Sequence, residues 1–121
     1  KQKALKCYEK AVEKMKACPN FPEELKIALF VNASIAASSL NDHKKAVEYS
    51  RKALNLNPQH SKAAYRLAFA LSSVGDLPEA ISICQRFENS LAEFASLKSQ
   101  IVQKQKQQEH REREMYGRMF K

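Results

Sequence analysis

LNDHKKAVEYSRKAL (Leu40–Leu54) and VGDLPEAISICQRFE (Val74–Glu88) align without gaps at an offset of 34 residues. A third copy, QKALKCYEKAV (Gln2–Val12), aligns with Lys44–Leu54 at an offset of 42. Self-similarity at such a fixed period predicts a repeated supersecondary unit. The matched pairs in the first two copies are Asp42 and Asp76, Ala46 and Ala80, Val47 and Ile81, and Ala53 and Phe87.

The composition predicts an all-α protein of about one domain. The chain has 121 residues and only two glycines, and Ala, Leu, Lys, Glu and Gln favour helix. No alternating apolar and polar run between turn residues predicts a strand. Hydrophobic periodicity predicts helices ending near Lys16, spanning 23–40, 43–55, 61–74 and 77–87, and beginning near Ser90.

A repeat of 34 residues built as helix–turn–helix resembles the tetratricopeptide repeat. Small residues let the two helices of a repeat approach closely, and Pro58 ends the second helix. The resemblance implies a helical solenoid over 1–88, with a half repeat (1–16), repeats at 23–57 and 61–88, and an extension helix over 89–121. The positions typical of the family are Phe30, Ala33, Ala46, Ala53, Pro58, Leu67, Ala68 and Ala80, whereas Ala64 replaces the expected aromatic residue.

The extension helix changes character along its length. Apolar residues recur at spacings of three to four up to Val102, which predicts packing on the last repeat. The run QKQKQQEHRERE that follows has no apolar residue and is expected to project into solvent. The helix ends in an apolar stripe, Met115, Tyr116, Met119 and Phe120.

The formal net charge of +8 is concentrated at the two ends. Residues 1–16 hold six cations and two anions, residues 98–121 hold seven and three, and the middle is neutral. The cations alternate with Glu and Gln on predicted helices, so we expect no nucleic-acid partner. No segment approaches the about 20 apolar residues of a membrane span, so no membrane partner is expected either.

The Cys and His residues predict neither a disulfide framework nor a metal site. Cys7, Cys18 and Cys84 are odd in number, and the three histidines stand alone, without paired spacings. We therefore expect a reducing, cytoplasmic (or also nuclear) location and no cofactor. No catalytic arrangement or phosphate-binding loop is present, so we expect no enzymatic activity.

Lys62 and Arg66 lie one turn apart and share a helix face. Asn32 precedes Arg66 by one repeat period, so stacking is expected to place all three side chains on one groove. They supply hydrogen-bond donors in excess, and a carboxylate satisfies them. The alternative is a pair of solvated cations, and the register with Asn32 favours the groove.

These three residues resemble the carboxylate clamp of chaperone-binding tetratricopeptide domains. The resemblance implies capture of the acidic C-terminus of Hsp90, Met-Glu-Glu-Val-Asp, or of its Hsp70 equivalent. It also implies a Lys and an Asn from a first helix that the chain does not contain, so three of five clamp positions are present. Val31, Ile35, Tyr65 and Phe69 are expected to line the groove, although Ile35 and Phe69 are equally consistent with the core.

The C-terminal EREMYGRMFK resembles the end of the repeat domain of large immunophilins, the FK506-binding and cyclophilin-type prolyl isomerases that serve Hsp90. In that resemblance Met115, Tyr116, Met119 and Phe120 form a docking motif, and a longer parent protein can carry an isomerase domain upstream. Two other interpretations stay open. One is a generic repeat scaffold without a clamp, and the other is calmodulin binding by the basic extension helix.

The chain begins in helical rhythm without an initiating Met or a signal peptide, so we expect a piece of a longer protein. Its first repeat holds only the second of two helices. Stacked repeats bury their core only against neighbours. We therefore expect this chain to dimerise through the incomplete repeat or to fray at its N-terminus.

Overall fold

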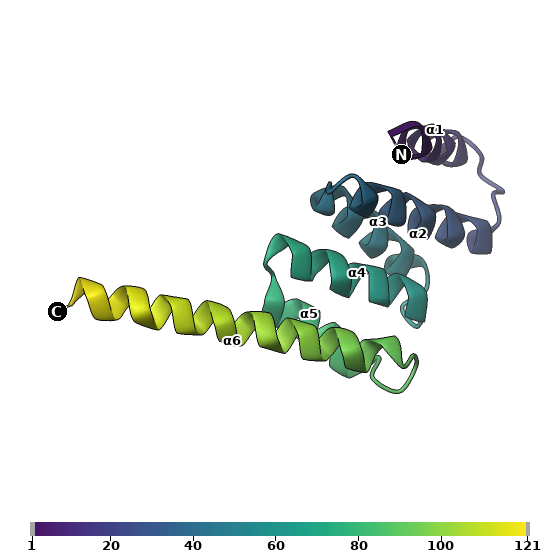
Figure 1. Ribbon diagram of the computed structural model, residues 1–121. Helices are drawn as coiled ribbons and strands as arrows, with labels where there is room; N and C mark the ends of the chain where they lie inside the picture. The colour runs from purple at the N-terminus through teal and green to yellow at the C-terminus, as the bar shows by residue number, and fades with distance from the viewer. Residues whose placement is uncertain (1, 121) are drawn as a thin grey trace.

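The computed structural model describes residues 2–120, which form six α-helices and no strand (Figure 1). This confirms the expected all-α solenoid. The ends of the first five helices lie within one residue of the predicted ends, whereas the sixth begins three residues later than Ser90. The helices are α1 (Gln2–Lys16), α2 (Glu23–Ser39), α3 (His43–Leu56), α4 (Ser61–Val74), α5 (Leu77–Arg86) and α6 (Glu93–Met119).

Successive helices pack against each other, and α2, α4 and α6 also pack together as one layer. Helix α6 runs on beyond the stack as a projecting rod (Figure 1). This arrangement follows from small residues at the repeat positions, because Ala33, Ala46, Ala53, Ala68 and Ala80 are all fully buried. The α2–α3 contact also contains a buried pair of hydroxyls, Ser34 Oγ and Ser50 Oγ, 2.7 Å apart.

The same turn follows α2 and α4, one repeat period apart. Asn41 and Gly75 both have positive φ, of 61° and 95°. The amide of the aspartate after each turn donates back into the preceding helix, Asp42 to Ala37 and Asp76 to Leu71, both at 2.9 Å. Glycine adopts a positive φ without strain and asparagine tolerates it. The aligned Asn-Asp and Gly-Asp pairs are therefore the sequence signature of this turn.

Helix α6 begins at Glu93 because the preceding residues form a separate turn. The amide of Ser90 donates to the carbonyl of Phe87 at 2.9 Å, and this tight turn is incompatible with a helix starting at Ser90. Phe94 is then fully buried. Its ring lies edge-on to Tyr65 and stacked on Phe87, with centroid distances of 5.8 and 5.7 Å. These contacts fix the first turn of α6 against the last repeat.

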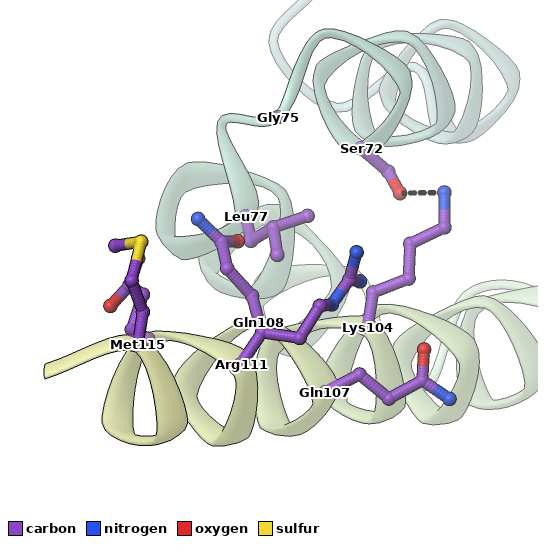
Figure 2. A pocket seen from close by; sticks show the side chains of 9 residues that line it. Ser72, Gly75, Leu77, Lys104, Gln107, Gln108, Arg111 and Met115 are labelled. Carbon is purple, nitrogen blue, oxygen red and sulfur yellow. Dashed lines mark hydrogen bonds between the residues drawn. The ribbon is translucent and has the colours of Figure 1, made fainter. Parts of the chain in front are cut away.

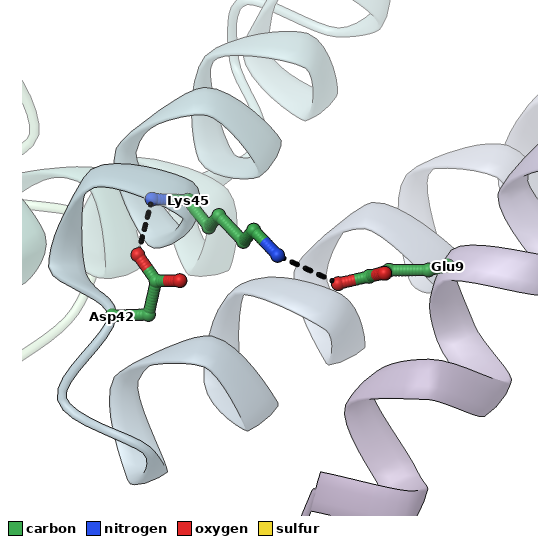
Figure 3. A network of polar contacts seen from close by, with 3 residues as sticks. All are labelled: Glu9, Asp42 and Lys45. Carbon is green, nitrogen blue, oxygen red and sulfur yellow. Dashed lines mark hydrogen bonds and ion pairs between the residues drawn. The ribbon is translucent and has the colours of Figure 1, made fainter.

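Apolar contacts hold α1 on α2 through the buried residues Leu5, Val12 and Met15. An ion pair of 3.0 Å between Glu9 and Lys45 also joins α1 to α3 (Figure 3). The hydrogen bond to Glu9 raises the pKa of Lys45. Exposed ion pairs contribute little to stability, so apolar burial is the main attachment of α1. Dimerisation or fraying at this helix stays a prediction.

Within residues 2–120, none of the helices combines the length and the apolar character that crossing a membrane requires.

Candidate functional site

A cavity of about 480 Å³ lies between α2, α4 and the start of α6. It brings together two cations, one anion and an apolar wall from three helices and the loop before α6. Its lining residues are Val31, Ile35, Lys62, Tyr65, Arg66, Leu91 and Glu93.

The two cations of this cavity have no anionic partner among residues 2–120. Lys62 is exposed and Arg66 is half-buried, and neither forms an ion pair within that part of the chain. The Arg66 guanidinium lies 5.7 Å from the centroid of the Tyr65 ring, a cation–π contact that orients it. The cavity therefore presents open, charged hydrogen-bond donors, which are suited to a carboxylate.

The apolar wall comes from the helices on either side of α4. Val31 is buried in the α2 core, and Ile35 packs against that core while also lining the cavity. Tyr65 is held from behind by the buried ring of Phe94. The wall is thus pre-formed, so an apolar ligand side chain could bury itself there without rearranging the fold.

Asn32 does not line this cavity, which differs from the sequence-based expectation of one shared groove. It lines a second, mostly apolar cavity of about 590 Å³ between α1 and α2. Consecutive residues in a helix point about 100° apart, so Val31 faces the α4 side while Asn32 faces the α1 side. The structure therefore places the amide and the two cations on neighbouring parts of the surface.

Phe69 also lies outside the lining of the cation cavity. Its side chain is 36% exposed on α4. It sits less than one full turn beyond Arg66, and its contribution to a groove is that of an exposed apolar neighbour. The four residues predicted to line the groove thus divide into three that do and one that does not.

Leu91 and Glu93 are cavity residues that the sequence did not indicate. They follow the last repeat in the loop and first turn of α6, 25 and 27 residues after Arg66. Glu93 reads as an ordinary acidic residue at a helix N-terminus. Only the path of the α5–α6 loop, which returns α6 to α4, reveals that it shares a cavity with Lys62 and Arg66.

A third cavity, of about 590 Å³, lies where α6 passes the turn between α4 and α5. Figure 2 shows Lys104 and Arg111 extending from α6 toward the end of α4. The Lys104 ammonium donates to Ser72 Oγ at 3.3 Å. This contact continues the attachment of α6 one turn beyond its last buried residue, Ile101.

The distal stripe of α6 packs against nothing within the described part of the chain. Met115, Tyr116, Met119 and Phe120 are 52%, 54%, 66% and 83% exposed. Their role as a docking motif stays a prediction, as does calmodulin binding by this helix.

All three cysteines are free, and Cys84 is buried in the core between α4, α5 and α6. Burial raises the pKa of its thiol. Among residues 2–120, His, Cys, Asp and Glu side chains form no group of three or more that could hold a metal ion.

Two solved structures share this fold. One is the Hsp90 co-chaperone Cns1 of Saccharomyces cerevisiae, with a TM-score of 0.80 and 22% identity over 97% of this chain. This chain spans only 38% of that one. The other is the C-terminal TPR-containing domain of a Plasmodium falciparum protein named as an FK506-binding protein, PFL2275c. Its TM-score is 0.78, with 18% identity over 90% of this chain and 80% of that chain.

The two neighbours are named as the two kinds of protein that the sequence resemblance predicts, and at these identities they establish the fold. The family model of the tetratricopeptide repeat matches residues 37–101, which is more than half of the chain and includes both copies of the 34-residue motif. This chain therefore belongs to the tetratricopeptide repeat family.

Proposed function

We propose that this chain binds the acidic C-terminal peptide of a cytoplasmic chaperone, Hsp90 or Hsp70, as the interaction module of an immunophilin-type co-chaperone. The observation that carries the proposal is the pair Lys62 and Arg66, which share one cavity and have no anionic partner among residues 2–120. Two like charges on adjacent turns repel, and a bound carboxylate relieves that repulsion.

The lining of the cavity supports an extended peptide rather than a lone anion. Val31, Ile35 and Leu91 provide apolar contacts beside the cations. Asn32 is exposed on the α1 side of α2, where its amide can bond a peptide that continues across that helix. The terminal carboxylate would accept from Lys62 and Arg66, and the preceding side chain would meet the apolar wall.

The alternative is a repeat scaffold that binds another protein without using a terminal carboxylate. The large apolar cavity between α1 and α2, bordered by the 55% exposed Leu25, favours this alternative. The two functions use different surfaces, so mapping the bound peptide distinguishes them.

Titration of the pentapeptide Met-Glu-Glu-Val-Asp into the isotopically labelled chain tests the proposal by nuclear magnetic resonance. We expect the largest amide shifts at Lys62, Arg66 and Leu91, with saturation at a single dissociation constant. Smaller shifts are expected at Asn32. Shifts centred on Met15 and Leu25, or on the distal part of α6, would contradict the clamp.

A further inference from the structure

Glu93 is the one anion among the residues that line the cation cavity. With Lys62 and Arg66 it leaves the lining with two positive charges and one negative charge. A ligand that carries several carboxylates would satisfy the cations but would also place a negative charge near Glu93. A ligand with a carboxylate at one end and a cation beside it would complement all three groups.

The position of Glu93 is fixed by its neighbour. Phe94 is fully buried between Tyr65 and Phe87, so the backbone of the first turn of α6 cannot withdraw from the cavity. The Glu93 side chain itself is exposed and forms no ion pair within residues 2–120. Its location at a helix N-terminus also favours the ionised form of the carboxyl group.

Leu91 and Glu93 form the α6 side of the cavity, whereas Val31 and Ile35 form the α2 side. A peptide held through its terminal carboxylate on α4 therefore has residues that pass close to α6. The side chain that lies there contacts Leu91 and experiences the charge of Glu93. An acidic side chain at that place is repelled, and a basic one is attracted.

We propose that Glu93 is a specificity-determining residue, which selects peptides that end in a free carboxylate and carry a Lys or Arg, rather than an Asp or Glu, beside α6. This inference rests on the proposed function, because it requires the carboxylate to bind at Lys62 and Arg66. It deepens that function by naming the charge pattern of the preferred ligand.

Calorimetric titration of two peptides, Met-Glu-Glu-Val-Asp and Met-Lys-Lys-Val-Asp, into the unmodified chain and Glu93→Gln tests the inference. Removing the Glu93 charge is expected to shift the ratio of the two affinities toward the acidic peptide by about five- to tenfold at low salt. The shift is expected to shrink as salt is added, because the groups are exposed to solvent.

Glu109→Gln is the matched control, since Glu109 is exposed on the same helix and lines none of the three cavities described above. It removes the same charge and is expected to change the affinity ratio by less than about twofold. Equal shifts in Glu93→Gln and Glu109→Gln would overturn the inference, because they would report only the net charge of the chain.

Arg66→Ala separates failure of this inference from failure of the clamp. If Arg66→Ala weakens both peptides while Glu93→Gln leaves their ratio unchanged, the clamp stands and the inference is wrong. If neither peptide binds, or if Arg66→Ala leaves both affinities unchanged, the proposed function fails and the inference fails with it.

Discussion

Replacing Lys62 and Arg66 together by alanine is expected to weaken binding of a peptide with a free terminal carboxylate by about 100-fold or more. A hydrogen bond to a charged group contributes about 1.5–3 kcal/mol, and the double variant removes at least two of them. Both side chains line the same cavity, and neither has an ion-pair partner within the described residues. Their loss therefore removes ligand contacts without breaking a contact of the fold, and calorimetry of the two chains measures the effect.

The double variant Lys44→Ala/Arg113→Ala provides a control with the same change in net charge. Both side chains are exposed on surfaces away from the cavity, and the affinity is expected to stay within about twofold of the unmodified chain. Equal weakening in the two double variants would mean that the peptide senses the overall charge of the chain. That result would contradict a specific role for Lys62 and Arg66.

Phe94→Ala is expected to lower the free energy of unfolding by about 3–5 kcal/mol, which is the usual cost of deleting a buried aromatic ring. The ring is fully buried between Tyr65 and Phe87. Its removal leaves a void at the junction of α6 with the last repeat. For a domain of this size the change corresponds to a fall in melting temperature of about 10–20 °C, measured by circular dichroism.

Phe120→Ala is the matched control, because that ring is 83% exposed and the same atoms are deleted. Its melting temperature is expected to stay within about 2 °C of that of the unmodified chain. Hydrogen exchange adds a local measurement, since repeats contact only their neighbours and α6 should lose protection before α2 and α3 do. A melting temperature of Phe94→Ala equal to that of Phe120→Ala would contradict the packing of α6 described above.

Most of the fold could be predicted because the repeat is written in local chemistry. The 34-residue offset joins Asn41 to Gly75, and these residues occupy the same left-handed position in two equivalent turns. The buried alanines of the repeats follow from the same alignment. The start of α6 was placed too early, because its sequence continues the helical periodicity while the turn that closes on Phe87 interrupts the backbone.

The candidate site was harder to predict than the fold. The repeat offset correctly places Asn32 and Arg66 at equivalent positions of α2 and α4, but equivalent positions near the end of a solenoid have different neighbours. Asn32 faces α1, whereas Arg66 faces the start of α6. Glu93 entered the site through the path of a loop outside the repeats, and no periodicity in the sequence encodes that path.

The measurement that tests the account most directly compares one acidic pentapeptide with a free C-terminus and the same peptide with an amidated C-terminus. Amidation removes the terminal charge and leaves every side chain in place, so it isolates the contact with Lys62 and Arg66. The clamp predicts that calorimetry of the full chain detects the free acid and that amidation weakens binding by at least about tenfold. Equal affinity for the two peptides would contradict the clamp and would favour a repeat scaffold that binds its partner without a terminal carboxylate.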